Sequence, residues 1–286
     1  MADLADELKR QRRNNGLLAG GTVVLVLLAI GSFLWLDKPG APKVEDVPAP
    51  PKQTAPPLAT PVADAPVPDP PQDTTPHQPA DADATLRKVV GSWSTAPELA
   101  AWASEDGILQ RVAAATNLTS RGASPKPVLA FVKIPGDFGV DEEIEKKPVV
   151  PGKPVDFTEK SFISATSFAR YDRVTQIVTA IDPIAAGKGY ATLRPYFDRV
   201  YGQIAAPGER FDSVLKGAIT RLIAVPVPEG RVQVVPFGAL YKYADTALED
   251  RKPADKHLLR FGPKNQRAIQ SWLRSFAVGA KIGAIE

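Results

Sequence analysis

Residues 263–279 read PKNQRAIQSWLRSFAVG and decide the class of fold. Large apolar side chains recur there at i, i+3, i+4 and i+7, the interval that places them on one face of an α-helix: Ile269, Trp272, Leu273 and Phe276. Arg267, Arg274 and Lys281 recur every seven residues on the opposite face. Lys264 lies beside them. The stretch therefore predicts an amphipathic helix that packs its apolar face on a core and turns a basic face to water.

The same periodicity predicts further helices upstream. Four stretches carry an apolar stripe with helical spacing: 108–118, 174–181, 193–204 and 215–222. Another helix should begin at the capping-box pattern Thr95-Ala96-Pro97-Glu98. Asp182-Pro183 is a stop signal for the 174–181 helix, and Asp212 is the expected N-cap of the 215–222 helix. We therefore expect a mainly α domain over residues 85–286.

Two regions interrupt the helical pattern. Residues 225–235 place a Pro228-Glu229-Gly230 turn between β-branched residues, which predicts a short β-hairpin or an extended pair. The apolar runs 128–134 and 148–155 predict two more short strands. An acidic tract separates these runs: Asp141, Glu142, Glu143 and Glu145. Because it lacks the Asp-x-Asp-x-Asp-Gly spacing of a calcium loop, we expect a solvated loop there.

An uncharged run, 14–36, precedes the domain. Its segment LLAGGTVVLVLLAIGSFLWL, 17–36, would span about 30 Å as a helix, which matches the core of a bilayer. A cleaved signal peptide is the competing interpretation. The run exceeds the usual ~7–15 apolar residues of such a peptide and has no clean small-x-small cleavage site at its end. We therefore predict an uncleaved transmembrane helix over residues 16–36.

The basic residues around this span predict its orientation. Lys9, Arg10, Arg12 and Arg13 precede it, whereas Lys38 and Lys43 follow it within a short distance. By the positive-inside rule, the tail 1–15 remains in the cytoplasm. For a bacterial chain this predicts a single-pass protein of the inner membrane with its C-terminal domain in the periplasm.

Residues 37–84 have the composition of a disordered linker. They hold three basic and eight acidic residues and no aromatic residue, and fourteen prolines lie from Pro39 to Pro79. Such a segment cannot bury enough apolar surface to offset the entropy of ordering. We expect a spacer between membrane and domain; the alternative is that Pro48-Ala49-Pro50-Pro51 is a ligand for a partner domain.

Composition excludes several kinds of chemistry. The 286 residues include no cysteine and two histidines. Disulfides, iron–sulfur clusters and thiol nucleophiles are therefore excluded, and a histidine-based metal site has almost no ligands to use. We expect no cofactor.

Several short motifs of the domain resemble a known family. They occur in the order Pro97-Glu98-Leu99-Ala100-Ala101-Trp102, Arg170-Tyr171-Asp172, Pro228-Glu229-Gly230, Tyr241-Lys242-Tyr243-Ala244-Asp245 and 257–265, HLLRFGPKN. Together, over about residues 86–278, they are similar to the bacterial domain-of-unknown-function family 3014. The stretch around 141–154 departs from that pattern. The resemblance implies a basic tail, one membrane span, a Pro-rich linker and this domain. No activity is assigned to the family, so the resemblance implies no catalytic residue.

The residue pattern gives little support for catalysis. A Ser-His-Asp hydrolase would depend on His257, the one histidine of residues 85–286, and no Gly-x-Ser-x-Gly elbow occurs. We interpret His257 as a helix-face residue. Gly187-Lys188-Gly189 lacks the upstream glycine and the hydroxyl residue of a phosphate loop, so we interpret it as an interhelical turn.

One candidate cleft remains, formed by five polar side chains: Arg170, Asp172, Arg173, Tyr196 and Asp198. Asp172 and Asp198 could form the carboxylate pair of a glycosidase. Neighbouring arginines favour ion pairs instead and would lower the pKa of Asp172, which makes it a poor acid. We assign no catalytic residue.

The basic residues near the last helix form the leading candidate for a partner site: Arg260, Lys264, Arg267 and Arg274. This face is either ordinary solvated surface or a patch for anionic lipid, an envelope polymer, an acidic protein or the chain's own acidic linker. The predicted location disfavours nucleic acid. The leading hypothesis is a non-enzymatic interaction or scaffold domain of the cell envelope, and the alternative is a membrane-tethered hydrolase or transferase acting on envelope glycan or lipid.

Overall fold

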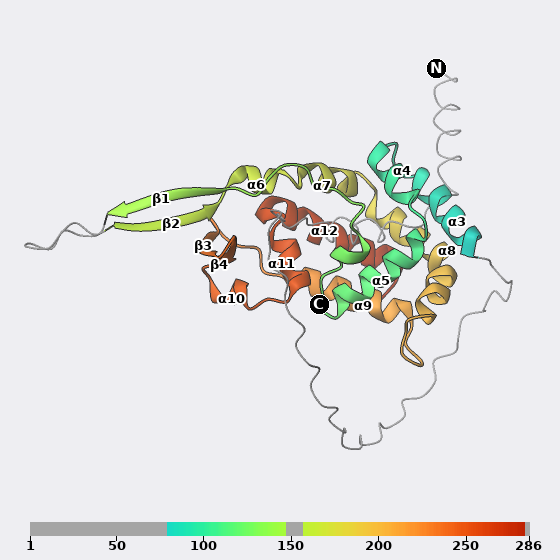
Figure 1. Cartoon of the computed structure of the whole chain (residues 1–286). Helices are drawn as coiled ribbons and strands as arrows, with labels where there is room; N and C mark the ends of the chain where they lie inside the picture. Colours follow the sequence, from blue (N-terminus) through green and yellow to red (C-terminus); the bar gives the residue numbers. More distant parts are fainter. Residues whose placement is uncertain (1–78, 147–156, 284–286) are drawn as a thin grey trace, which may run out of the picture. The chain divides into compact units, whose positions relative to one another are not determined.

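The computed structural model describes residues 79–146 and 157–283, which form a mainly helical fold with one small antiparallel sheet (Figure 1). The helices are α3 (Pro79–Gly91), α4 (Pro97–Ala103), α5 (Ile108–Ser120), η1 (Lys126–Val128, a 3-10 turn), α6 (Ala165–Ala169), α7 (Asp172–Thr179), α8 (Pro183–Gly202), α9 (Phe211–Ile223), α10 (Thr246–Glu249), α11 (Pro253–Leu259) and α12 (Gly262–Ala280). The strands are β1 (Val140–Lys146), β2 (Phe157–Ile163), β3 (Gln233–Phe237) and β4 (Leu240–Tyr243). The mainly α prediction is confirmed.

The predicted transmembrane helix, 16–36, and most of the predicted linker lie outside the described residues. Within residues 79–146 and 157–283, the structure contains no helix with the length and apolar character needed to cross a membrane.

The predicted linker extends too far. We expected disorder to residue 84, but α3 begins at Pro79. Ala82 and Leu86 of this helix are buried in the core, and Asp83 Oδ1 accepts a hydrogen bond from Leu109 N–H (3.2 Å) at the start of α5. The sequence pattern missed these residues because the groups on which α3 packs belong to other elements, α4, α5 and α8.

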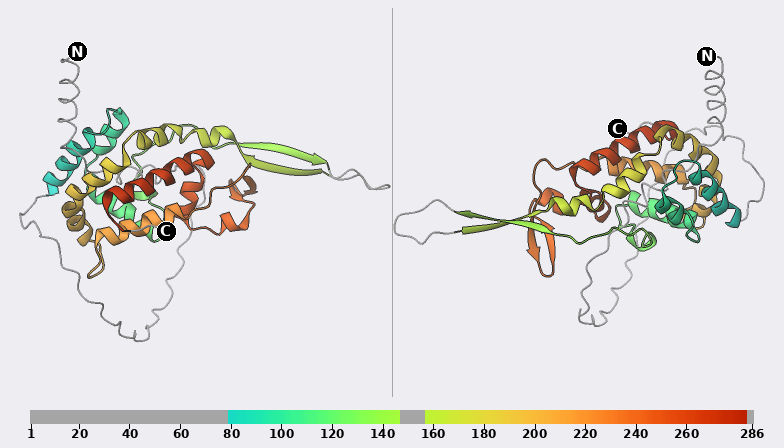
Figure 2. Two further views of the ribbon diagram at one scale, coloured as in Figure 1. Left: turned by 180° about the vertical axis from the view of Figure 1, so that it is seen from behind. Right: turned by 90° about the horizontal axis from the view of Figure 1, so that it is seen from above.

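The predicted amphipathic helix is confirmed as α12, which lies against α7, α8, α9 and α11 (Figure 2). Ile269, Leu273 and Phe276 are completely buried, and Trp272 Nε1 donates to the backbone oxygen of Ile181 (2.9 Å). The apolar stripe read from the sequence is therefore the face that α12 presents to the core.

The packing of α8 on α12 depends on glycines. A Cβ added at Gly279 would lie 2.6 Å from the backbone oxygen of Ile184, and one at Gly187 would clash with the α12 backbone. The prediction of a turn at Gly187-Lys188-Gly189 is therefore wrong, because these residues lie inside α8. Gly187 allows two helix backbones to touch and does not reverse the chain.

Aromatic rings fill the space between α8 and α9. Phe197 and Phe211 stack with their centroids 4.5 Å apart. Asp212 does not cap α9 as expected, because Arg210 occupies the N-cap position. Instead, Asp212 Oδ1 accepts from Tyr190 Oη (2.5 Å) and from Arg194 Nε (3.2 Å). The carboxylate thus joins α8 to α9.

The sheet has the order β1-β2-β3-β4, with antiparallel neighbours. The hairpin expected at 225–235 is displaced: β3 begins at Gln233, and the turn to β4 contains Gly238 at φ +59°. Side chains from α12 explain the displacement. Gln266 Nε2 donates to the oxygens of Val225 (3.1 Å) and Pro226 (2.9 Å), which leaves this segment outside the sheet.

The acidic tract 141–145 lies on a strand. We expected a solvated loop, but β1 pairs along its full length with β2. The four acidic side chains of the tract are nevertheless exposed. The run 128–134 was expected to be a strand. It begins in the 3-10 turn η1 and continues as irregular backbone. The run 148–155 lies outside the described residues.

Candidate functional site

The solvent side of α12 carries a continuous row of exposed residues: Lys264, Arg267, Ser271, Arg274, Val278 and Lys281. They are separated alternately by three and four positions, which keeps them on one side of the helix. We call its four cations, Lys264, Arg267, Arg274 and Lys281, the basic α12 face. The buried side of the same helix fixes this face on the domain, so its cations lie on a rigid support.

The four residues predicted as an anion or partner patch have different surroundings. Lys264 is 81% exposed and lies 3.3 Å from Asp172 Oδ2. Arg260 is half-buried at the end of α11, where its Nη1 lies 3.4 Å from His257 Nδ1. Arg267 and Arg274 are exposed, and neither forms an ion pair within residues 79–146 and 157–283. The exposed cations of the patch without an ion partner among the described residues are therefore Arg267 and Arg274.

Lys281 extends the basic face beyond the predicted patch. It is exposed and forms the C-cap of α12 with a left-handed backbone, φ +53°. It has no ion partner in the part of the chain that the structure describes. Position 281 thus adds a third accessible cation, seven residues after Arg274.

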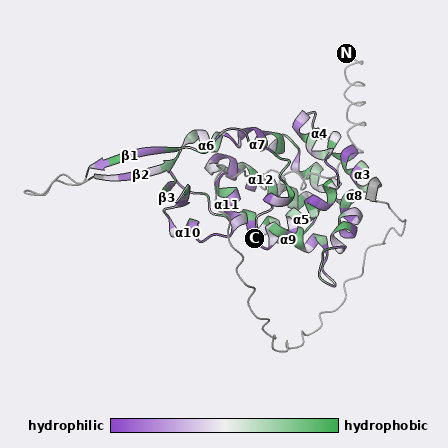
Figure 3. Cartoon of the chain, viewed as in Figure 1, coloured by the Kyte–Doolittle hydropathy of each residue, from purple (hydrophilic) through white to green (hydrophobic). Residues whose placement is uncertain are grey.

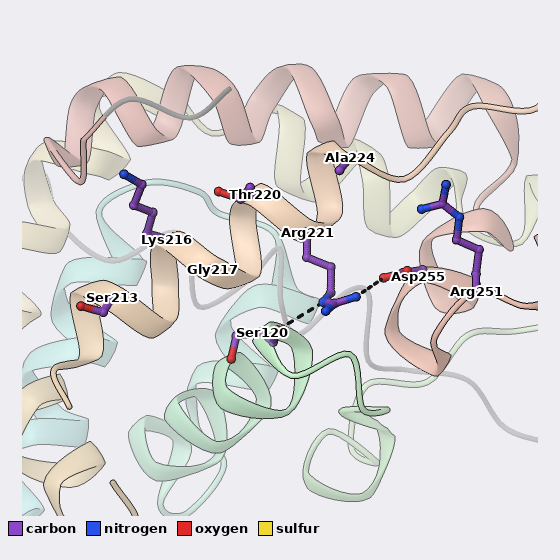
Figure 4. A pocket seen from close by; sticks show the side chains of 9 residues that line it. All are labelled: Ser120, Ser213, Lys216, Gly217, Thr220, Arg221, Ala224, Arg251 and Asp255. Carbon is purple, nitrogen blue, oxygen red and sulfur yellow. Dashed lines mark hydrogen bonds and ion pairs between the residues drawn. The ribbon is translucent and has the colours of Figure 1, made fainter. Parts of the chain in front are cut away.

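A shallow groove of about 530 Å³ lies between α9, the end of α5 and the start of α11 (Figure 4). Its lining residues are Ser120, Ser213, Lys216, Gly217, Thr220, Arg221, Ala224, Arg251 and Asp255. Arg221 is held in its centre, because its Nε donates to the backbone oxygen of Ser120 (3.2 Å) and its Nη1 to Asp255 Oδ1 (3.3 Å). Asp255 is buried. The two interactions of Arg221 join α9 to α5 and to α11.

The groove also contains two cations outside that pair. Lys216 and Arg251 lie toward opposite ends of it, and neither has an ion partner among the described residues (Figure 4). Lys216 Nζ lies near the end of α12, 3.3 Å from the place of a Cβ on Gly283. Sequence reasoning missed this groove because its residues come from three separate segments, and only the basic character of 251–286 hinted at it.

The structure places Asp172 and Arg173 against two different helices. Asp172 accepts from Asn265 Nδ2 (2.8 Å) on α12, and this hydrogen bond, with help from Lys264, lowers the pKa of the carboxyl group. Arg173 forms a bidentate pair with Glu98 on α4, at 2.7 Å and 2.9 Å. Glu98 therefore contacts α7 and takes no part in a capping box, since α4 has no side-chain cap.

The other residues of the candidate cleft have separate partners. Tyr196 Oη lies 3.5 Å from Thr85 Oγ1 on α3. Asp198 accepts from Phe211 N–H (3.2 Å) at the start of α9 and pairs with Arg210 (3.6 Å). Arg170 lies over the ring of Tyr171, 5.9 Å from its centroid. The contacts of these five residues lead to α3, α4, α9 and α12, and none of the five lines the groove.

The structure contains a serine–histidine pair that the sequence pattern did not predict. Ser124 Oγ lies 2.6 Å from His257 Nε2, although 133 positions separate the two residues. Arg260 contacts the other ring nitrogen, Nδ1, which a carboxylate contacts in a catalytic triad. Because arginine can only donate, Nδ1 accepts and Nε2–H donates to Ser124. The ring therefore cannot take a proton from this serine.

The surroundings of His257 also oppose a role as a base. Burial, together with the charges of Arg260 and Lys126, lowers its pKa from 6.5 to about 3. A general base is most effective when its pKa lies near the working pH. His257 is a residue of helix α11, as expected, and it is neutral and buried.

No metal-binding cluster of three or more His, Cys, Asp or Glu side chains occurs within residues 79–146 and 157–283.

Fold and surface together define a mainly helical domain with a small sheet, a basic helix face and a shallow polar groove. The chain belongs to the family described as Protein of unknown function (DUF3014), whose family model matches residues 108–277. The resemblance seen in the sequence motifs is thus confirmed. Comparison with curated proteins gave no match, and comparison with solved structures gave none either.

Proposed function

We propose that this chain is a single-pass protein of the bacterial inner membrane whose periplasmic domain is a non-enzymatic interaction or scaffold module. Residues 16–36 anchor it with the N-terminus in the cytoplasm, and the Pro-rich segment after the span separates the domain from the membrane. The module binds an envelope protein or polymer that carries negative charge. No nucleic acid and no cofactor is part of this proposal.

One observation carries the proposal: three cations of the basic α12 face, Arg267, Arg274 and Lys281, are exposed and without ion partners in the described part of the chain. Arg173 and Arg194, by contrast, each have a neighbouring carboxylate that offsets their charge. A row of unpaired cations on a rigid helix instead attracts an anionic surface and speeds its association.

The alternative, a tethered hydrolase or transferase, lacks such an observation. The candidate cleft residues hold α3, α4, α9 and α12 in place through their contacts. The serine–histidine pair has the proton on the wrong nitrogen for catalysis. Both features support the structural roles of these residues.

The proposal is tested by crosslinking the full chain in living cells and identifying captured partners by mass spectrometry. The variant Arg267→Glu/Arg274→Glu/Lys281→Glu should lose its main partner by about tenfold or more, because attraction becomes repulsion. A control, Lys133→Glu/Lys188→Glu/Arg199→Glu, changes the same amount of charge at other exposed positions and should keep the partner. Equal recovery by the two variants would reject the basic α12 face as the binding site.

A further inference from the structure

The shallow groove beside α9 has a floor of small side chains (Figure 4). Along α9 its lining residues are Ser213, Lys216, Gly217, Thr220, Arg221 and Ala224. They recur at i, i+3, i+4, i+7, i+8 and i+11, so they share one side of the helix. Four of the six are small, which keeps the groove open along about 16 Å of α9.

The other side of α9 fixes the groove on the domain. Its core-facing residues are completely buried: Leu215, Ala218, Ile219 and Leu222. Figure 3 shows the hydrophobic and hydrophilic residues that make up the two sides of α9. Arg221 also ties the helix to the backbone of α5 and to Asp255 of α11. The groove is therefore a preformed surface, and a ligand does not have to order it on binding.

Positive charge lies at both ends of the groove and is offset in its centre. Lys216 and Arg251 lie on opposite sides of Arg221 and have no ion partner among the described residues (Figure 4). The central charge of Arg221 is offset by the buried Asp255, 3.3 Å away. The groove thus attracts an anionic group at each end and a neutral polar group between them.

The two end cations are too far apart for one small anion. α9 rises about 12 Å between Lys216 and Ala224, and Arg251 lies on the Ala224 side of Arg221 (Figure 4). A single phosphate or carboxylate can contact only one end at a time. A ligand that contacts both ends is extended and carries two anionic groups about 12 Å apart or more.

The lining residues disfavour several classes of ligand. Small-molecule pockets are lined mainly by apolar and aromatic side chains, but none of the described lining residues is aromatic or both large and apolar. Nucleobases stack on aromatic rings, which this lining does not offer. A polyphosphate carries charge on every unit and would place one close to Asp255, which repels it. The lining therefore fits a neutral polar chain with a few acidic groups.

An extended acidic peptide meets these requirements. Residues four apart in a strand point to the same side and are separated by about 13 Å. Two carboxylates with this spacing can reach Lys216 and Arg251 together. The peptide groups between them can bond the hydroxyls of Ser213 and Thr220, which both donate and accept. Arg221 uses two of its five N–H groups within the fold, so three remain for the peptide.

We propose that this groove binds an acidic segment of a partner protein in extended conformation, with one carboxylate at Lys216 and another at Arg251. The site goes beyond the proposed function, because its cations belong to α9 and to the residue that follows α10, and the basic α12 face takes no part. Recognition of acidic motifs by clustered cations is a known mode of peptide binding. The groove selects for the spacing of two acids as well as for their charge.

The contact is weak and sensitive to salt. Both ion pairs lie at the surface, where such pairs contribute modestly and are screened by added ions. The fixed position of the groove lowers the entropic cost on the side of this chain. Affinity therefore depends on both ends being occupied at once.

The test uses the full chain in detergent and a fluorescent peptide with two glutamates separated by three serine or glycine residues. A second peptide has the two glutamates side by side, and a third has glutamines in their place. By fluorescence anisotropy at about 0.15 M salt, the first peptide should bind several-fold more tightly than the second and about tenfold more tightly than the third. Equal affinity for the first and second peptides would overturn the proposal, because it would show that the two ends are not bridged.

Variants of the groove locate the peptide. Lys216→Gln and Arg251→Gln should each weaken binding of the first peptide about threefold to tenfold and remove its advantage over the second. Ala224→Trp covers the groove without a change of charge and should weaken binding as well. The matched control Lys188→Gln/Arg199→Gln removes two exposed cations of α8 and should bind like the unchanged chain. Unchanged binding in any of the three groove variants would place the peptide elsewhere and reject the site.

Two more measurements separate this site from its alternatives. Inorganic polyphosphate and an oligogalacturonate are added as competitors, and displacement of the peptide by either at a lower concentration than unlabelled peptide would reject the peptide as the ligand class. Arg267→Glu/Arg274→Glu, on the basic α12 face, should leave peptide affinity within about twofold. A large loss there would assign the peptide to the basic α12 face, so that this inference fails while the proposed function stands.

Discussion

At the scale of single residues, His257 links the fold to pH. Its neutral ring is buried against Ser124 and Arg260, and its pKa is lowered from 6.5 to about 3. In the unfolded chain the ring takes up a proton below pH 6.5, whereas in the folded chain it does so only near pH 3. The unfolded state therefore binds more protons between these values, and the free energy of unfolding falls as the pH falls through this window.

We predict a loss of about 2 kcal/mol from this residue between pH 7 and pH 5. The measurement is denaturant unfolding of the domain at both values, compared with His257→Gln, which should show a pH dependence smaller by that amount. Above pH 5 the carboxylates with lowered pKa, such as Glu249, remain ionised and contribute little to the difference. An unchanged pH dependence in His257→Gln would contradict a neutral, buried ring.

Gly187 shows how one missing Cβ determines a helix contact. A side chain there would meet the backbone of α12, including the carbonyl carbon of Gly279 at 2.6 Å. Because backbone cannot turn aside as a side chain can, Gly187→Ala must push α8 and α12 apart. We predict a loss of about 3 kcal/mol or more in the free energy of unfolding.

Gly202 provides the control on the same helix. A Cβ added at this last residue of α8 meets nothing within 4 Å. Gly202→Ala should therefore be neutral or stabilise by up to about 1 kcal/mol, since alanine favours the helix. Equal effects of Gly187→Ala and Gly202→Ala in thermal unfolding would contradict the close contact of the two backbones.

At the scale of secondary-structure elements, two glutamines of α12, Gln266 and Gln270, bind backbone carbonyls at the end of α9 and just after it. Gln270 Nε2 donates to the backbone oxygens of Leu222 (3.0 Å), Ile223 (3.2 Å) and Val225 (2.8 Å). The last carbonyls of a helix have no partner within it, and burial without one is costly. Gln270 thus provides from another helix the hydrogen bonds that a C-cap would supply.

We predict that Gln270→Leu lowers the free energy of unfolding by about 1–3 kcal/mol, because the Ile223 oxygen loses its side-chain donor and the oxygens of Leu222 and Val225 each lose one of two donors, while the side-chain volume is kept. Ser271→Ala, one position away on the exposed side, should change it by less than about 0.5 kcal/mol. Both are measured by chemical denaturation. A Gln270→Leu protein as stable as Ser271→Ala would show that water satisfies these carbonyls instead.

Helical elements could be predicted from the sequence because periodic apolar residues are a local signal. The α12 stripe led to the right helix with the right buried face. Caps and turns were harder to predict, because they depend on groups far away in the sequence. Asp83 caps the start of α5, and Gln266 binds the backbone of residues 225–226, where a hairpin was expected. Glycine is ambiguous in the same way, as Gly187 permits helix packing where a turn was expected.

The acidic tract illustrates the limit for strands. Four acidic residues in five positions predict exposure to solvent, and these side chains on β1 are indeed exposed. Its partner strand, its register and the guanidinium of Arg231 on Phe162 come from residues up to 90 positions away, which no local pattern includes. Exposure could therefore be predicted and the strand could not.

At the scale of the whole molecule, the candidate site was predictable only where one element supplies it. The basic α12 face follows from a seven-residue repeat on one helix, so Arg267 and Arg274 were found. The groove draws Ser120, Arg221 and Asp255 from three helices, and the pair of Ser124 with His257 also depends on the fold. The hydrogen bonds and ion pairs of the five cleft residues lead to neighbours on different elements, which their spacing in the sequence does not indicate.

The charge and length of the N-terminal segment predict the membrane topology of the chain. The span proposed for residues 16–36 leaves the tail 1–15 on one side and the α12 domain on the other. Because the chain has no cysteine, a single introduced thiol reports its own location without background. Ser271→Cys lies on the exposed side of α12, and Ala5→Cys lies in the basic tail.

In intact bacterial spheroplasts, a membrane-impermeant maleimide should label Ser271→Cys and leave Ala5→Cys unlabelled until the cells are lysed. The reason is that moving the four basic residues of the tail through the bilayer is far less favourable than moving the side with Lys38 and Lys43. Labelling is read as a mass shift of the purified protein. Labelling of Ala5→Cys alone would reverse the topology, and labelling of neither before lysis would place the domain in the cytoplasm. Either result would remove envelope partners from the proposed function.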